Sequence, residues 1–195
     1  MELEVRLLSV LIVSAQDKFS EQVLPLLPAS RFFPVDKAGS VNEARRKTAD
    51  RSYDIILINA PLPDDFGARF AMDVTTSSSS AAALFVRSEL YDAVFEKACF
   101  AGVFVLRKPT SPGTISMSLD WLAATRERMR RLEKKSVSLQ EKMDEIKLVN
   151  RAKWVLITHL DMTEDAAHRY IEKQAMDRCV SKRTVAEDIL RTYKQ

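Results

Sequence analysis

The chain has 195 residues, of which 46% are hydrophobic, and carries a formal net charge of +3 at neutral pH. This length allows one or two small domains with a connector, and the hydrophobic fraction excludes a chain that is disordered throughout. No run of about 18 apolar residues occurs, so that we expect no membrane span and no membrane partner. The first residues are acidic where a signal peptide would be basic.

The cysteine and histidine content also limits the choice of function. Cys99 and Cys179 lie far apart and form no CxxC pair, which is typical of free, mostly buried thiols in a reducing compartment. We therefore expect a cytoplasmic protein. His159 and His168 lack the spacing of a metal site, and neither a metal nor a cofactor is expected.

The first 110 residues alternate between strand-like and helix-like patterns. Short apolar runs rich in branched residues predict strands at residues 7–13, 31–35, 53–59, 81–86 and 102–106. Helical patterns between them cover residues 17–27, 40–50 and 89–100, with Ser40 as an N-cap three residues before Glu43. Strands separated by single helices indicate parallel pairing, so that we predict an α/β fold with a five-stranded, flavodoxin-like parallel sheet. Residues 75–80 are expected to form a flexible loop.

In a parallel sheet, functional side chains lie at the carboxyl ends of the strands. Those ends carry Ser14, Ala15, Asn59, Ser88 and Lys108. The order of the elements, the segment from Asp54 to Gly67, and Lys108 followed by proline resemble the receiver domain of bacterial response regulators in two-component signalling. The resemblance covers roughly residues 6–120 and implies a Mg²⁺ site built on an acidic pair, with an aspartate that accepts a phosphoryl group.

This sequence departs from the receiver pattern where the chemistry needs it. Ser14 and Ala15 replace the acidic pair, so that Mg²⁺ loses its charged ligands, and the amide of Asn59 is a poor nucleophile that should accept no phosphoryl group. Asp17, Asp64 and Asp65 are not expected to restore metal binding. Lys108 is expected to cap Asn59 or a carbonyl group, and either Arg87 or Ser88 occupies the switch position. We therefore predict a pseudo-receiver, a fold retained either for dimerisation or for binding a partner such as a sensor or inhibitor protein.

A long helix without glycine or proline follows, from about residue 115 to residue 157. Apolar side chains recur in it at alternating spacings of three and four, which is the period of a two-helix seam. We predict a parallel homodimer through this helix, with Ser136 and Asn150 as polar residues that set the register. The alternative is that the apolar stripe packs on the chain's own domains. The predicted seam contains Leu122, Met129, Leu132, Leu139, Met143 and Ile146.

The C-terminal residues predict a small three-helix bundle. After a break near residues 159–162, Thr163 is a suitable N-cap for a helix to about Arg178, and Ser181 caps a last helix from Lys182 to about Tyr193. The expected core contains Leu156, Ala167, Tyr170, Ile171, Ala175, Met176, Val185, Ala186, Ile189 and Leu190.

This tail resembles the ANTAR module, a three-helix RNA-binding domain of transcription antiterminators. The likeness rests on residues 151–153, Leu156, residues 163–167, residues 175–178 and residues 185–186. It implies binding to hairpins of leader mRNA that blocks a downstream terminator. Trp154 stands where the family usually has glycine. The residues expected to contact RNA are Arg151, Lys153, Arg169, Lys173, Arg178, Lys182 and Arg183.

These patterns together predict three parts: a pseudo-receiver at 1–120, a coiled-coil helix at 121–150 and an ANTAR domain at 151–195. The order resembles that of amide- and nitrate-responsive antiterminators. Two alternatives are a DNA-binding regulator with a C-terminal helix-turn-helix and a signalling scaffold that binds no nucleic acid. No paired catalytic carboxylates, nucleophile–base pair or phosphate-binding glycine loop are found, so that an enzyme is not expected.

Overall fold

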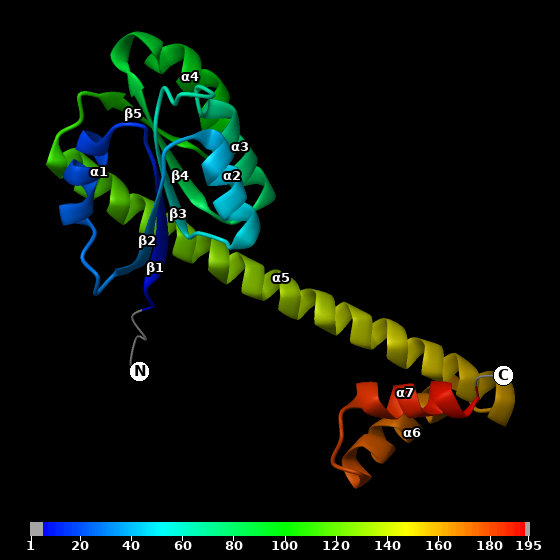
Figure 1. Cartoon of the computed structure of the whole chain (residues 1–195). Helices are drawn as coiled ribbons and strands as arrows, with labels where there is room; N and C mark the ends of the chain where they lie inside the picture. Colours follow the sequence, from blue (N-terminus) through cyan, green and yellow to red (C-terminus); the bar gives the residue numbers. More distant parts are fainter. Residues whose placement is uncertain (1–5, 194–195) are drawn as a thin grey trace. The chain divides into compact units, whose positions relative to one another are not determined.

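The computed structural model describes residues 6–193, so that most of the acidic start considered above lies outside the described residues. The chain divides between Arg131 and Leu132 into two compact units. Helix α5 (Pro112–Leu160) belongs to both of them (Figure 1). The boundaries predicted at residues 120 and 150, which set a coiled-coil segment apart from both domains, stay a prediction. In the described part of the chain, no helix has the length and apolarity needed to cross a membrane.

The first unit is built on a five-stranded sheet in the order β2-β1-β3-β4-β5, in which all neighbouring strands are parallel. This confirms the predicted fold class. The central strands are buried on both faces, which explains their continuous apolar sequences. The strands are β1 (Leu8–Val13), β2 (Phe32–Ala38), β3 (Ile55–Asn59), β4 (Ala81–Arg87) and β5 (Phe104–Lys108).

Helices cover both faces of this sheet (Figure 1). One core packs α2 (Val41–Asp50), α3 (Ala68–Ser77) and α4 (Tyr91–Ala98) against the sheet. The opposite core contains α1 (Asp17–Val23) and the start of α5. Alternate residues of each strand point to opposite cores, as the pleat requires. Single 3-10 turns complete the unit at η1 (Leu24–Leu26), η2 (Ser88–Leu90) and η3 (Cys99–Ala101).

The prediction of a flexible loop at residues 75–80 is wrong for its first half, because helix α3 continues to Ser77. The hydroxyl groups of Thr75 and Ser77 donate hydrogen bonds to the carbonyl groups of Ala71 and Asp73, one turn earlier in the helix. Serine and threonine usually compete with helical hydrogen bonding, but here their side chains bond back onto the helix. The low-complexity stretch therefore ends a helix.

Leu122 was expected on the dimer seam, and this assignment is wrong. Its side chain is fully buried in the core shared by α1, α5 and the sheet, together with Ile115 and Leu119. The heptad period alone could not separate this first stretch of α5 from the rest, because a helix that packs on a sheet also repeats its apolar residues every three or four positions. From residue 131 to residue 144, by contrast, every side chain of α5 is exposed.

Within the first unit, a largely buried ion pair links α5 to the residue that precedes β3. Arg126 donates from Nε to Oδ1 of Asp54 over 2.9 Å, and Ser9 donates from its N–H and its hydroxyl to Oδ2, each over 3.0 Å. Burial alone would raise the pKa of Asp54, but the hydrogen bonds from Ser9 and Arg126 outweigh it and hold the pKa below its ordinary value. The carboxylate is therefore charged and compensated.

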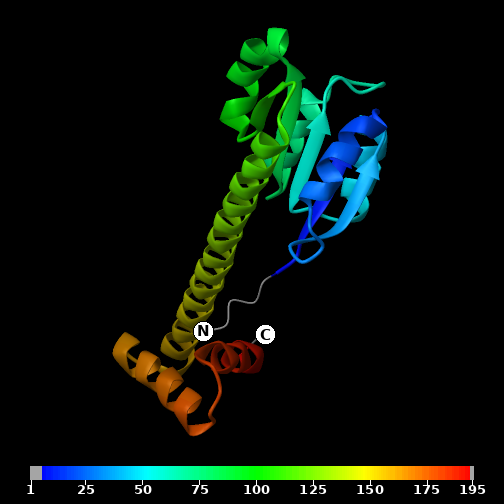
Figure 2. The same ribbon diagram turned by 90° about the vertical axis from the view of Figure 1, so that its left-hand side faces the viewer.

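The second unit is a three-helix bundle made by the end of α5, α6 (Glu164–Asp177) and α7 (Lys182–Thr192), as Figure 2 shows. The predicted caps are confirmed: Thr163 accepts from the N–H of Ala166 and Ser181 from the N–H of Thr184. Its buried core consists of Val149, Ala152, Leu156, Ala167, Ile171, Ala175, Val185, Ala186 and Ile189.

Three residues of this unit are less buried than the sequence suggested. Tyr170 is 39% exposed and Met176 is 77% exposed, because the core face of α6 is set by Ala167, Ile171 and Ala175. Cys179 is also exposed and was expected to be buried.

Candidate functional sites

The degenerate receiver site lies at the carboxyl ends of β1, β3 and β5. Lys108 donates from Nζ to Oδ1 of Asn59 over 2.8 Å and also to the carbonyl group of Ala60. Asn59 in turn donates from Nδ2 to the hydroxyl oxygen of Ser14 over 3.0 Å, and the Ser14 hydroxyl donates to the carbonyl group of Gln16. Both hydrogen bonds considered for Lys108 are present. The three side chains form one continuous chain of hydrogen bonds that ends at the backbone of Gln16.

The electrostatics of this site differ from those of a phosphoacceptor. Burial lowers the pKa of Lys108, and the nearby charge of Arg87 lowers it further. Asn59 is 3% exposed and brings no charge to offset that of the lysine. Ser88 donates its hydroxyl to the carbonyl oxygen of Lys108 over 3.1 Å, whereas Ala15 is exposed and has no polar side-chain group. Nothing in this set resembles the carboxylate cluster that holds Mg²⁺.

The acidic residues of the neighbouring loop have other partners. Asp64 accepts hydrogen bonds from the backbone N–H groups of Asn42 and Val41, over 2.8 and 2.9 Å, at the start of α2. These bonds hold the pKa of Asp64 below its ordinary value. Asp65 accepts from the N–H of Gly67 over 2.6 Å. Within residues 6–193, no group of three His, Cys, Asp or Glu side chains is placed to hold a metal ion.

Four of the seven basic residues predicted to contact RNA form ion pairs inside the second unit. Both partners of each ion pair lie in the second unit, and most of the paired side chains are partly exposed. The sequence did not reveal these pairs, because all but one join residues about ten positions apart. The pairs are Lys153–Glu164 (3.0 Å), Arg178–Asp188 (2.6 Å), Lys182–Glu172 (2.5 Å) and Arg183–Glu187 (3.1 Å).

The other three, Arg151, Arg169 and Lys173, are exposed. Across the described residues, none of these three forms an ion pair with an acidic side chain. Arg169 and Lys173 are one turn apart on α6, on the side opposite the core. The exposed side chain of Met176 lies on the same side, and that of Tyr170 lies at its flank. We call Arg169, Tyr170, Lys173 and Met176 the outer face of α6.

Comparisons with known proteins agree with this two-part structure. Residues 138–190 match the model of the ANTAR domain. The transcriptional regulatory protein PdtaR of Mycobacterium tuberculosis is 27% identical over 184 residues, which cover 94% of this chain and 89% of that protein.

The first unit is similar to solved receiver structures. A signal receiver domain of an HD domain-containing protein from Pseudomonas fluorescens Pf-5 is 18% identical with a TM-score of 0.57, covering 67% of this chain and 96% of that one. A two-component response regulator from Clostridium difficile is 18% identical with a TM-score of 0.52, covering 63% and 98%. At this identity the likeness shows the fold alone. The chain thus joins a domain of the receiver fold to a segment that matches the ANTAR domain, in the order that its sequence predicted.

Proposed function

We propose that this chain is a non-enzymatic transcription regulator whose ANTAR domain binds hairpins of leader mRNA and prevents a terminator from forming. The observation that carries this proposal is the outer face of α6. There Arg169 and Lys173 are exposed beside an exposed tyrosine, and neither forms an ion pair with an acidic side chain of residues 6–193. The relative PdtaR is named a transcriptional regulatory protein, which supports the regulatory part.

The chemistry of this face suits an RNA loop. Unpaired cations bind phosphates and release counterions, while an aromatic ring provides a surface on which splayed bases stack. Arg178, Lys182 and Arg183 are already neutralised by acidic residues of the bundle. We therefore assign them a smaller share of the RNA contact than Arg151, Arg169 and Lys173.

We further propose that a partner, rather than phosphorylation, controls the protein. The amide of Asn59 occupies the acceptor position, and its hydrogen bonds with Lys108 and Ser14 are internal to the fold. A sensor or inhibitor protein bound to the pseudo-receiver is the simplest source of a signal in a cytoplasmic regulator of this kind.

A homodimer completes the proposal. Leu132, Leu139, Met143 and Ile146 recur at seam positions of α5 and are between 53% and 61% exposed. A helix that leaves such a stripe in water is stabilised when a second copy covers it. The dimer would present two ANTAR domains to one leader RNA.

The test of RNA binding compares hairpin RNA with duplex DNA in a titration followed by fluorescence anisotropy. The double variant Arg169→Ala, Lys173→Ala should weaken hairpin binding and flatten the dependence of log K on log salt by roughly 0.7 per lost cation, the value for single strands. The matched control is Lys134→Ala, Lys135→Ala, which removes the same charge from exposed positions outside the matched ANTAR residues.

Equal effects of the two double variants would refute the outer face of α6 as the contact. Preferential binding to duplex DNA would favour the helix-turn-helix alternative instead. That alternative places Glu187 and Asp188 on the helix that would face the DNA, where they would repel phosphates. A protein that binds neither nucleic acid would be the signalling scaffold.

A further inference from the structure

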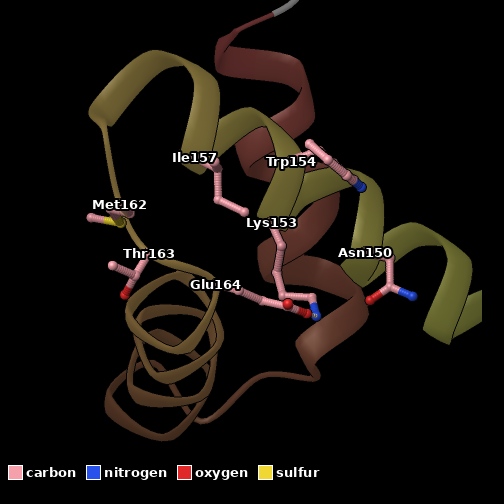
Figure 3. Close-up of a pocket in the computed structure, with 7 residues that line it drawn as sticks. All are labelled: Asn150, Lys153, Trp154, Ile157, Met162, Thr163 and Glu164. Carbon is pink, nitrogen blue, oxygen red and sulfur yellow. Dashed lines mark hydrogen bonds and ion pairs between the residues drawn. The ribbon is translucent and has the colours of Figure 1, made fainter.

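A cavity of about 470 Å³ lies in the second unit, between the end of α5 and the start of α6 (Figure 3). This volume falls within the range of small-ligand sites, roughly 300–1,000 Å³. Four of the lining residues recur at spacings of three and four along one side of α5. The cavity is lined by Asn150, Lys153, Trp154, Ile157, Met162, Thr163 and Glu164.

Trp154 is the unusual member of this lining. Its side chain is 67% exposed, although tryptophan is on average one of the more buried residue types. Its neighbours Ala152 and Leu156 fill the core of the bundle, and Trp154 is not part of that core. The indole therefore offers a wide, flat, apolar surface at the cavity without stabilising the interior.

The charges around the cavity select a neutral ligand. Nζ of Lys153 lies 3.0 Å from Oε1 of Glu164, and the lysine side chain is only 15% exposed, so that the cation is already compensated. An anion such as phosphate would meet the Glu164 carboxylate. Asn150 presents an amide with both donors and acceptors. A planar, neutral group with polar edges matches this lining.

We propose that the cavity binds one unpaired base of the RNA loop, and that this base stacks on the indole of Trp154. This inference rests on the proposed function and names the part of the RNA that the site takes. The phosphates of the same loop have separate partners, because Arg151 on the same helix is exposed and forms no ion pair with any described acidic residue. A base held in a duplex has both faces covered by its neighbours, so that only a splayed base enters.

The experiment uses Trp154 as its own reporter. The chain has two tryptophans, and the variant Trp121→Phe leaves Trp154 as the single source of tryptophan emission. The probe is an RNA stem-loop selected for binding from a pool with a randomised loop, and its control is the same stem as a blunt duplex. We expect the stem-loop to quench Trp154 emission and the blunt duplex to leave it unchanged.

Substitutions then measure the contribution of stacking. Trp154→Ala should weaken stem-loop binding about 5- to 150-fold, which corresponds to the ~1–3 kcal/mol per base of aromatic stacking, while Trp154→Phe retains most of the affinity. The salt slope should not change, because no phosphate contact is lost. An abasic nucleotide at one loop position should produce the same loss, and this loss should not add to that of Trp154→Ala.

The outcomes separate this inference from the proposed function. If Trp154→Ala is folded by circular dichroism and binds the stem-loop with unchanged affinity, the inference is wrong, even where Arg169→Ala, Lys173→Ala still weakens binding. Emission that depends on protein concentration without RNA would show that a second copy covers the indole, which also overturns it. Absence of any stem-loop binding by the wild type would refute the proposed function itself.

Discussion

The polar groups at the sheet edge and those on the outer face of α6 differ in whether they have partners within the fold. At the sheet edge, Lys108 donates to Asn59 and Ala60, and Asn59 donates to Ser14. On α6, Arg169 and Lys173 form no ion pair with the described acidic residues. Groups that satisfy one another contribute to folding, whereas exposed and unpaired groups remain available to a ligand.

This contrast separates stability from binding. A buried hydrogen-bonded group is costly to remove, because its partner is left without a donor or an acceptor. An exposed cation contributes little to folding but much to the attraction of a polyanion. Substitutions in the two regions should therefore change different measurements.

The largest effect is expected at a third region, the apolar seam of α5. The double variant Leu132→Asp, Leu139→Asp should convert the proposed dimer to a monomer, because it would place like charges against each other in the interface at a cost of several kcal/mol. Sedimentation at micromolar concentration measures whether the variant is a monomer or a dimer. The control is Val137→Asp, whose position is equally exposed but off the seam. A wild type that is already monomeric at this concentration would contradict the seam.

The next largest effect is a loss of stability when the ion pair between Arg126 on α5 and Asp54 is removed. Arg126→Ala leaves the carboxylate of Asp54 buried without its cation, and we expect the free energy of unfolding to fall by roughly 2–4 kcal/mol. Urea denaturation measures the loss. Arg128→Ala, at an exposed position of the same helix, serves as the control and should have little effect.

The same pair predicts a dependence on pH. The folded pKa of Asp54 lies below its ordinary value, so that its contribution to stability is fully present above the unfolded pKa of about 3.9 and is lost as the pH falls through the folded pKa. The difference in stability between the wild type and Arg126→Ala should therefore be constant near neutral pH and shrink below about pH 4. A difference that grows on acidification would contradict this assignment.

A smaller loss is expected at the degenerate receiver site. Lys108→Met removes the donor to Asn59 and Ala60, and should lower the free energy of unfolding by about 1–3 kcal/mol. Binding of hairpin RNA should not change. Lys97→Met removes the same charge from an exposed position on α4 and should be neutral. Equal stability of the two variants would show that the hydrogen bonds of Lys108 contribute nothing.

Substitutions on the outer face of α6 should weaken RNA binding and leave the stability of the fold almost unchanged. Arg169→Ala, Lys173→Ala should change the free energy of unfolding by less than about 0.5 kcal/mol, the usual range for surface substitutions, while it weakens RNA binding. Thermal unfolding with and without hairpin RNA measures both quantities. A variant that loses RNA binding only because it unfolds would remove the contrast between the two regions.

The last prediction is that acetyl phosphate does not phosphorylate the protein. Incubation with acetyl phosphate and Mg²⁺ should not increase the mass of the intact protein by a phosphoryl group, because Asn59 is a poor nucleophile and no carboxylates stand at Ser14 and Ala15. Asn59→Asp alone should also remain unmodified, since the acidic pair that holds Mg²⁺ is still missing. A stoichiometric adduct on the wild type would show that a different group accepts the phosphoryl.

The sequence predicted the elements whose signals are local. The parallel sheet follows from continuous apolar runs, and Ser40, Thr163 and Ser181 each accept the hydrogen bond expected of an N-cap. Features that depend on distant residues were missed. Periodicity could not show that Leu122 packs in the first core, because the pattern does not name the partner.

In the candidate sites, too, the sequence predicted which residues lie at the strand ends but not which distant residues pair with one another. Asn59 at the acceptor position could be read directly from the resemblance, and its neighbours Ser14 and Lys108 from the ends of the strands. The acidic partners of Lys153, Arg178 and Lys182 could not, since each lies on another helix or turn of the bundle. The division of the basic residues into paired and unpaired sets therefore required the structure.

The fully exposed stretch of α5, residues 131–144, has a consequence for how genes of this kind diverge. An insertion or deletion there removes no buried side chain from either core. In the proposed dimer, however, a change of seven residues keeps the apolar stripe in register, whereas a change of three or four residues forces the coiled coil to overwind or unwind locally. We therefore expect the lengths of related chains to differ in this stretch by whole heptads, while residues off the seam vary more freely than Leu132, Leu139 and Met143.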